Sequence, residues 1–315
     1  MSSSKHRQFS RRAMMQAGVA AGVALATRAT FAADAKPLAP ILKAIPSTGE
    51  KLPAVGVGTN AFGVNSADEL AEIKRVLQGL PEIGGKVIDT ARAYGSSELV
   101  IGKLLADIGN RDKVFLATKT PMGGGYEGGK AVLDESFRRL QVSKIDLLQL
   151  HNVGGVRELL PAMQEYKQAG KIRYVGITTS IDGQYGQLLE ILRNNKFDFV
   201  QVNYSIGNRD ADQQVLRFAQ EKGLGVLINQ PFGGRNGSYF PRLANKKVPE
   251  WAAEFDATTW AQFMLKYIIS HPAVTAAIPG TTTLAFLQDN QSGGRGALPT
   301  AAQRKKMEEY WDSLG

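Results

Sequence analysis

The sequence predicts an α/β protein with a single (β/α)8 barrel domain, preceded by an export signal. Two observations favour this fold. Eight short apolar or β-branched runs alternate with longer segments of helical period. The first run is not followed by the G-x-G-x-x-G turn typical of open, doubly wound sheets, since Gly56-Val57-Gly58 continues into Thr59. A length of 315 residues fits one barrel domain, which we assign to residues 36–315.

Composition restricts the possible partners and sites. The net charge is +9, and residues 1–35 carry five basic residues against one acidic residue. The only dense basic run elsewhere is Arg304-Lys305-Lys306, which resembles one face of a helix, so we expect no nucleic-acid partner. The chain has no cysteine, which excludes disulfides, zinc–thiolate sites and thiol nucleophiles. We expect no metal site.

The first 35 residues resemble a twin-arginine signal peptide. A basic segment centred on Ser10-Arg11-Arg12 precedes an uncharged, weakly apolar stretch, Ala13–Ala26, and then small residues around Phe31–Ala35. The apolar stretch is too short for a stable membrane anchor. We therefore expect export of the folded protein by the Tat machinery, cleavage between Ala32 and Lys36, and a periplasmic location. An amphipathic N-terminal helix and an uncleaved anchor are the alternatives.

The elements of the predicted barrel follow in order. A hairpin is expected from Ile41-Leu42 to Lys51-Leu52, turning at Pro46–Gly49. The eight expected strands are Ala54–Thr59, Lys86–Thr90, Val114–Lys119, Ile145–Leu150, Arg173–Thr178, Phe199–Asn203, Gly225–Asn229 and Thr275–Pro279. The expected helices are Asp68–Gln78, Ser97–Leu105, Ala131–Leu140, Val156–Gln168, Tyr185–Asn194, Gln213–Lys222 and Thr259–Ser270.

Four polar residues fall at or just after the ends of three neighbouring predicted strands: Asp89, Tyr94, Lys119 and His151. The carboxyl ends of the strands form the catalytic face of such barrels, so these side chains should meet at one mouth. Each has an ordinary alternative: a helix cap for Asp89, a packed aromatic for Tyr94, a solvated lysine or a rim histidine. Together they suit carbonyl reduction, in which a tyrosine donates a proton, a lysine held by a carboxylate stabilises the phenolate, and a histidine orients the carbonyl.

The motifs resemble those of the aldo-keto reductase family over roughly residues 50–291. Asp89–Glu98 matches the D-T-A-x-x-Y-G-x-S-E signature, and Lys119 follows Ala117-Thr118 as in that family. Leu148–Asn152 matches the strand that ends in the histidine, and Ala169–Ile177 resembles the G-K-x-R-x-x-G segment. The resemblance implies that Tyr94 is the general acid, that Lys119 and Asp89 tune it, and that His151 positions the carbonyl of a small-molecule substrate.

The resemblance also implies an extended NADPH across the barrel mouth. Thr178 and Thr179 stand where the family has a Ser-Asn pair on the carboxamide, and Gln201 matches the glutamine beside it. Asp289 and Asn290 resemble the acidic-Asn pair near the adenine. The remaining implied cofactor residues are Gly58, Thr59, Gln230, Phe232, Gly233, Thr281 and Thr282.

Three positions depart from the family pattern. Asn229 replaces an aromatic residue that often stacks on the nicotinamide. Gly280 and Phe286 stand near positions often held by Lys and Arg, which clamp the 2′-phosphate. The sequence therefore leaves NADH possible as the cofactor.

Two other classes of function stay open at this point. One is an exported non-redox barrel or binding protein that retains the pocket, because free nicotinamide cofactor is scarce outside the cytoplasm. The other is a phosphate-binding isomerase or aldolase, with Lys119 forming a Schiff base. The substrate loops are expected at Asn60–Phe62, Met122–Tyr126 and Phe232–Trp251. Their aromatic residues, Phe62, Tyr126, Tyr239 and Trp251, indicate either an apolar pocket or a packed rim.

Overall fold

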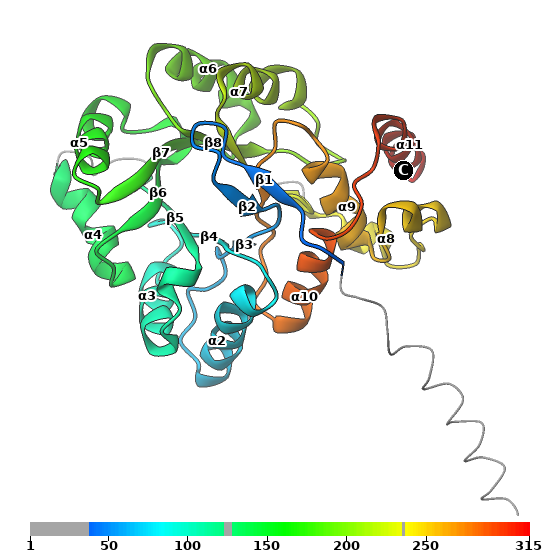
Figure 1. Cartoon of the computed structure of the whole chain (residues 1–315), viewed down its shortest axis with the longest axis horizontal. Helices are drawn as coiled ribbons and strands as arrows, with labels where there is room; N and C mark the ends of the chain where they lie inside the picture. The colour runs from blue at the N-terminus through cyan, green and yellow to red at the C-terminus, as the bar shows by residue number, and fades with distance from the viewer. Residues whose placement is uncertain (1–37, 123–127, 235–236) are drawn as a thin grey trace, which may run out of the picture. The chain divides into compact units, whose positions relative to one another are not determined.

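The computed structural model describes residues 38–122, 128–234 and 237–315 (Figure 1). The predicted signal peptide, with its cleavage region, and the loop residue Tyr126 lie outside the described residues.

Eight parallel strands form one sheet, in the order β12-β9-β8-β7-β6-β5-β4-β3. Consecutive strands pair in parallel, as the alternation of strands and helices predicts. The strands are β3 (Val57–Gly58), β4 (Val87–Asp89), β5 (Phe115–Lys119), β6 (Ile145–Leu150), β7 (Ile172–Thr178), β8 (Phe199–Asn203), β9 (Gly225–Asn229) and β12 (Ala276–Ala277).

The ring closes between β3 and β12 through isolated bridges rather than a continuous ladder. Val55 pairs with Ala277 and Gly58 pairs with Gly280. The amide of Gly58 donates to the carbonyl of Pro279 at 2.9 Å. A side chain at Gly58 would place its Cβ 2.8 Å from the carbonyl oxygen of Ile278, so a glycine is needed for this close approach. The predicted (β/α)8 barrel is thus confirmed, with a narrow closing seam.

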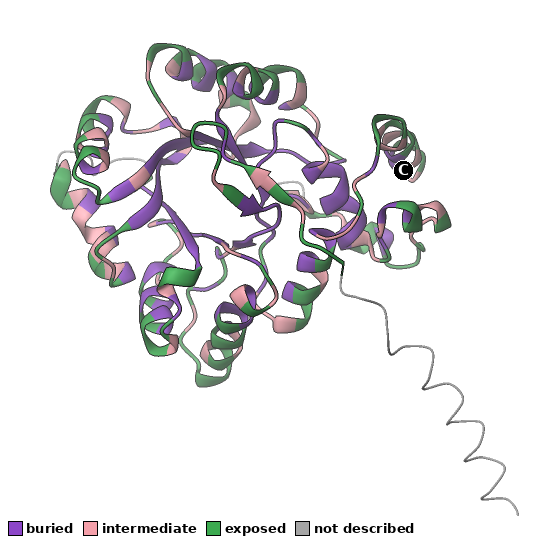
Figure 2. Cartoon of the chain, in the orientation of Figure 1, coloured by how far each residue is buried: buried purple, intermediate pink, exposed green. Residues whose placement is uncertain are grey.

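Helices surround the strands (Figure 1). Most of them have a buried face and an exposed face (Figure 2), whereas α9 (Trp260–Ile269) is buried from Ala261 to Ile269. The helices are α2 (Ala67–Glu82), α3 (Ser97–Ile108), α4 (Lys130–Leu140), α5 (Val156–Gln168), α6 (Tyr185–Asn194), α7 (Arg217–Lys222), α8 (Phe240–Leu243), α9 (Trp260–Ile269), α10 (Leu284–Gly293) and α11 (Ala301–Ser313). Within the described ranges, no helix is both long and apolar enough to cross a membrane.

The ends of several helices follow from local sequence. Ser66 and Thr259 cap α2 and α9 by accepting hydrogen bonds from the amides of Glu69 and Gln262. Gly223 ends α7 in the left-handed conformation with φ 66°, which favours glycine at a helix C-cap. The predicted helix Gln213–Lys222 begins instead as a π-helical turn, Asp212–Leu216, which leads into α7.

A two-stranded hairpin, β1 (Leu42–Ala44) with β2 (Lys51–Pro53), precedes the barrel. Its residues Ile45 and Leu52 are fully buried. They belong to the same apolar cluster as the inward-facing strand residues Phe115, Leu147 and Phe199. The hairpin therefore fills the end of the barrel opposite the carboxyl ends of the strands.

Candidate active site

A cavity of about 770 Å³ opens at the carboxyl ends of the strands. The four predicted catalytic residues all line it: Asp89 ends β4, Tyr94 lies in the loop after β4, Lys119 ends β5, and His151 follows β6. Because parallel strands end at the same face, residues that are far apart in the sequence meet here. The structure thus places the four side chains around one space.

A buried ion pair lies beneath Tyr94. Lys119 Nζ donates to Asp89 Oδ2 at 2.6 Å and to the carbonyl of Thr90 at 2.8 Å, and both side chains are almost fully buried. Burial alone would lower the pKa of Lys119, but the charge of Asp89, the nearby Tyr94 and hydrogen bonds to both raise it above its usual value. Lys119 is therefore a fixed ammonium group. This argues against the Schiff-base alternative, which needs a neutral amine.

Hydrogen bonds of Glu98 and Arg139 hold the loop that carries Tyr94 in place. Glu98 is fully buried and accepts hydrogen bonds from Thr118 Oγ1 at 2.7 Å and from Arg139 Nε at 2.8 Å. Arg139 also donates to the carbonyl of Gly95. These contacts join the start of α3 to β5 and α4, and they fix the segment between Asp89 and Glu98. The position of Tyr94 above Lys119 follows from this anchoring.

His151 faces the cavity beside Tyr94. The two rings lie edge to face, with centroids 6.4 Å apart. Burial, together with the positive charge of Lys119, lowers the pKa of His151 to about 4. The ring is therefore neutral at pH 7. Its Nδ1 is buried and lacks a hydrogen-bond partner among the described residues.

A layer of amides surrounds the Asp89 carboxylate inside the barrel. Gln201 Nε2 donates to Asp89 Oδ2 at 3.2 Å, and Gln149 donates to Gln201. Gln201 also donates to Asn229, the residue that replaces the aromatic of the family pattern. Sequence reasoning missed Gln149. The signal was present, because Gln149 lies two residues before His151 on a fully buried strand and so faces the same side.

The implied cofactor residues fall into two groups. Those that line the cavity are Gly58, Thr59, Thr178, Gln230, Phe232 and Gly233. Thr179, Gln201, Thr281, Thr282, Asp289 and Asn290 are not among its described lining residues. Some of the second group have internal partners: Thr179 donates to Gln184 at 2.6 Å, and Asp289 accepts from Thr259 and from Gln262 at the start of α9.

The cavity suits the nicotinamide and diphosphate parts of a dinucleotide, since the residues implied near the adenine are not among its described lining residues. It extends from Tyr94 and His151 past Asn229 to Gly280, and glycines at 58, 233, 234, 237 and 280 leave parts of its wall as bare backbone. Backbone amides without side chains suit a diphosphate, which needs hydrogen-bond donors at close range. Asn60, Met122 and Phe240 line the cavity as members of the expected substrate loops, whereas sequence reasoning missed Asn152 and Ser180.

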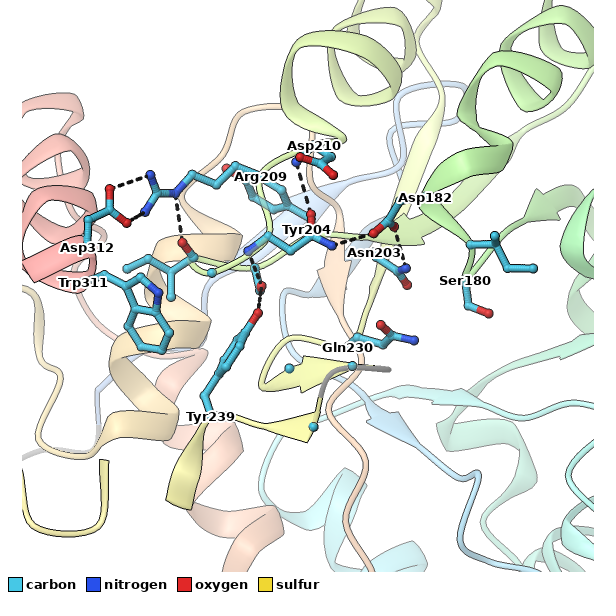
Figure 3. Close-up of a pocket in the computed structure, with 18 residues that line it drawn as sticks. Ser180, Asp182, Asn203, Tyr204, Arg209, Asp210, Gln230, Tyr239, Trp311 and Asp312 are labelled. Atoms are coloured by element: carbon cyan, nitrogen blue, oxygen red, sulfur yellow. Dashed lines mark hydrogen bonds and ion pairs between the residues drawn. The ribbon is translucent and has the colours of Figure 1, made fainter. Parts of the chain in front are cut away.

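The predicted substrate aromatics mostly pack elsewhere. Phe62 is fully buried in the core. Trp251 packs against Phe255 and Phe263, and Tyr239 packs against Trp311. The packed-rim interpretation therefore holds for Phe62 and Trp251, whereas Tyr239 also lines a cavity beside the catalytic one (Figure 3). The apolar surface of the cavity comes instead from residues such as Met122, Phe232 and Phe240.

The barrel and its site define a protein of the carbonyl-reducing class. The model of the aldo/keto reductase family matches residues 54–301, and the chain therefore belongs to that family. It is 32% identical over 244 residues to methylglyoxal reductase YeaE of Escherichia coli (strain K12), an alignment that covers 76% of this chain and 84% of that protein. It is 30% identical to aldo-keto reductase YhdN of Bacillus subtilis (strain 168), over 58% of this chain and 60% of that protein.

Solved structures of the same family superpose on the barrel. An aldo-keto reductase from Klebsiella pneumoniae in complex with NADPH is 25% identical, with a TM-score of 0.68 over 86% of this chain and 95% of that one. The holo form of an aldo-keto reductase from Bacillus halodurans is 24% identical, also with a TM-score of 0.68, over 86% and 96%. The chain is thus an oxidoreductase that reduces carbonyl groups with NAD(P)H. The predicted reaction and cofactor class are confirmed, and the binding-protein alternative is not favoured.

Proposed function

We propose that this chain reduces a small aldehyde or ketone with NADPH and that Tyr94 donates the proton. The observation that carries the proposal is the buried Lys119–Asp89 pair directly beneath Tyr94. A tyrosine is a reluctant acid at neutral pH, and a fixed ammonium beside it stabilises the phenolate that remains.

Each residue has one part in this reaction. The cofactor, when bound, supplies a hydride to the carbonyl carbon. Neutral His151 hydrogen-bonds the carbonyl oxygen and orients it toward Tyr94. Tyr94 transfers its proton to that oxygen, and Lys119 stabilises the resulting phenolate. Asp89 holds Lys119 charged and in place.

The preference for NADPH rests on family membership and is weakened by this chain's own residues. The Klebsiella pneumoniae relative was solved with NADPH. Phe286 is 65% exposed. It stands near a position where members of the family often have a Lys or Arg that binds the 2′-phosphate of NADPH. We expect a modest preference, on the order of tenfold, or about 1.4 kcal/mol.

The substrate we propose for the first assay is methylglyoxal, because the Escherichia coli relative is named for its reduction. Purified protein should oxidise NADPH only when methylglyoxal or a simple aldehyde is present. Tyr94→Phe should lose this activity and still bind NADPH by fluorescence titration. Failure of the wild type to reduce any aldehyde with either cofactor would overturn the proposed function.

We further propose that residues 1–35 are removed during Tat export and that the barrel crosses folded with its cofactor bound. Ser10-Arg11-Arg12 and the weakly apolar stretch after it support this route. A ligand that binds only the native state also stabilises it in transit.

Changing Arg11 and Arg12 to Lys should leave active precursor in the cytoplasm. Arrival of this variant in the periplasm would contradict export by the Tat machinery. The amount of nucleotide bound to protein purified from the periplasm tests whether the cofactor crosses with the barrel. Protein without bound nucleotide would contradict export with the cofactor bound.

A further inference from the structure

Three amide side chains form a hydrogen-bonded series inside the barrel, next to the Asp89 carboxylate. Gln149 Nε2 donates to Gln201 Oε1, and Gln201 Nε2 donates in turn to Asn229 Oδ1. Gln201 Nε2 also donates to Asp89 Oδ2 at 3.2 Å. Gln149 and Gln201 are fully buried, whereas Asn229 is half-buried and lines the catalytic cavity. The reaction described above uses Asp89 and gives no part to Gln149.

The wall of the barrel has room for the Gln149 side chain. Asp89, Gln149 and Gln201 lie on β4, β6 and β8, which are alternate strands of the ring. Side chains from alternate strands share one interior layer in such barrels. On the intervening strand β7, Gly176 pairs with Gln149. A Cβ at Gly176 would lie 2.8 Å from Gln149 Cγ, so the glycine leaves the space that the glutamine occupies.

A role in core packing does not explain a glutamine at position 149. Its Oε1 is buried and has no hydrogen-bond partner among the described residues. An unpaired buried acceptor destabilises a fold, and branched apolar side chains usually fill the interior of such barrels. The N–H groups of Gln149 do have neighbours, because Nε2 donates to Gln201 and lies 3.5 Å from Asp89 Oδ1. The side chain is therefore of use through its donors.

The contacts of Gln201 fix the direction in which its amide faces. A carboxylate only accepts hydrogen bonds, so the group beside Asp89 has to present an N–H. Gln149 secures this orientation, because its own N–H occupies the oxygen on the other side of the Gln201 amide. The second N–H of Gln201 is held by Asn229. The amide therefore cannot turn away from Asp89 without breaking hydrogen bonds at both ends.

The hydrogen bonds that Asp89 accepts act on its charge. Burial raises the pKa of Asp89, and the charge of Lys119 and hydrogen bonds from Lys119 and the two glutamines oppose this rise. An ionised Asp89 keeps Lys119 an ammonium group, 5.1 Å from the centre of the Tyr94 ring. With fewer donors around Asp89, the proton of the ion pair shifts from Lys119 toward the carboxylate. The positive charge beside Tyr94 then weakens.

We propose that Gln149 is a positioning residue for the proton donor. It holds the amide of Gln201 on the Asp89 carboxylate, and this contact keeps Lys119 charged beneath Tyr94. The inference rests on the proposed role of Tyr94 as the proton donor. Gln149 is not among the described lining residues of the catalytic cavity, so its effect passes through Gln201 rather than through a contact with the substrate.

The direct test follows the ionisation of Tyr94 in the full chain, without substrate or cofactor. The nine tyrosines are labelled with ¹³C at Cζ, and Tyr94→Phe identifies the signal of Tyr94. Gln149→Met keeps the length of the side chain and removes its N–H groups. The Tyr94 signal should then titrate about 0.5–1 pH unit higher than in the wild type, because a weaker positive charge stabilises the phenolate less. An unchanged titration would overturn the proposal.

Few other groups can cause such a shift. The titratable side chains among the described lining residues of the catalytic cavity are Asp89, Tyr94, Lys119 and His151. His151 has a pKa of about 4, so it stays neutral while a tyrosine titrates. Glu98 and Arg139, which hold the loop of Tyr94, form an ion pair with each other. A shift in Gln149→Met therefore reports on the Asp89–Lys119 pair.

The kinetic test is the pH profile for reduction of methylglyoxal with NADPH. A general acid has to be protonated, so kcat/KM falls on the alkaline side of its ionisation. Gln149→Met should move this alkaline limb to higher pH, lower kcat and leave KM for methylglyoxal unchanged. A purely structural role would lower the amount of active enzyme and leave the limb in place, which would contradict the proposal.

Asn110 provides the matched control. It is 3% exposed, its Nδ2 donates to the carbonyl of Leu77, and its Oδ1 has no partner among the described residues, as in Gln149. It lies between α3 and β5, at the end of the barrel opposite the catalytic cavity. Asn110→Leu removes a buried amide of the same kind and should leave the titration of Tyr94 unchanged.

A double variant tests the path through Gln201. When Gln201 is replaced by Met, Gln149 has no amide to position, so adding Gln149→Met should cause no further shift. A further shift of the same size would contradict action through Gln201. If Gln149→Met does not fold, Asn229→Ala takes its place. That change releases the Gln201 amide from the cavity side and should move the titration of Tyr94 in the same direction.

The outcomes separate the two proposals. Reduction of aldehydes by the wild type, with an unchanged Tyr94 titration in Gln149→Met, would overturn the positioning role while the proposed function stands. A shifted titration in a protein that reduces no aldehyde would support the positioning role and overturn the proposed function.

Discussion

Lys119 Nζ lies 5.1 Å from the centre of the Tyr94 ring. The charge is therefore close enough to stabilise a phenolate and is held there by Asp89 rather than by solvent. The phenol itself is half-buried at the cavity wall, where a substrate can reach it.

Replacing Tyr94 with Phe tests the proton donor. The change keeps the ring and its packing and removes only the hydroxyl. We expect kcat to fall about 10²–10⁴-fold, the usual effect of losing a general acid, with the dissociation constant for NADPH unchanged. Near-normal turnover of an aldehyde that the wild type reduces would contradict the mechanism.

Replacing Asp89 with Asn tests the ion pair. The variant leaves the Lys119 ammonium buried without its counter-charge, so the free energy of unfolding should fall by about 3 kcal/mol. Chemical denaturation measures this change. The double variant Asp89→Asn/Lys119→Met should be less destabilised than the single variant, because it no longer buries an unpaired charge. Additive losses would show that the two residues do not interact.

The pH dependence of stability tests the environment of His151. Its pKa falls from about 6.5 in the unfolded chain to about 4 in the folded protein. The unfolded state therefore binds more protons between these values, and stability is lost as the pH falls through this window. His151→Gln should remove this part of the loss, about 3 kcal/mol, when denaturation curves at pH 7 and pH 4 are compared. Identical pH dependence in both proteins would contradict a neutral, buried His151.

Cofactor selectivity can be changed at Phe286. This side chain is exposed on α10, so Phe286→Arg should fold normally. A guanidinium here should increase the preference for NADPH over NADH by about tenfold, since a hydrogen bond to a charged group contributes roughly 1.5–3 kcal/mol. Phe286→Gln is the uncharged control and should leave the ratio of the two dissociation constants near that of the wild type.

The barrel was readable from the sequence because short apolar runs, buried along their whole length, alternate with segments of helical period. The strands Ile145–Leu150, Phe199–Asn203 and Gly225–Asn229 and the helices α5 and α6 have the predicted bounds. The closing strands are shorter than predicted: β3 has only Val57–Gly58 and β12 only Ala276–Ala277, because isolated bridges close the ring there. The pattern of apolar residues in the sequence does not show whether two strands pair by a continuous ladder or by isolated bridges.

The site was only partly readable. Strand ends predicted where Asp89, Lys119 and His151 would meet, since the carboxyl ends of parallel strands share one face. The helices α8 and α10 were not predicted as elements, and of α11 only a helical face at Arg304-Lys305-Lys306 was predicted. A smaller cavity beside the catalytic one depends on α11 meeting the loop after β8, as in the Arg209–Asp312 ion pair. Such a tertiary contact leaves no periodic signal in either segment.

The hairpin at the base of the barrel also restricts the path of protons. Ile45 and Leu52 close that end with apolar side chains, and the layer above them is equally apolar. Buried apolar side chains thus lie between this end of the barrel and the buried Lys119 and Asp89. In the proposed mechanism each turnover leaves Tyr94 without its proton, and the replacement proton enters through the mouth of the barrel by which the alcohol leaves. Reprotonation of the tyrosine and release of the product therefore use the same opening of the barrel. A bound product that fills this opening delays both steps.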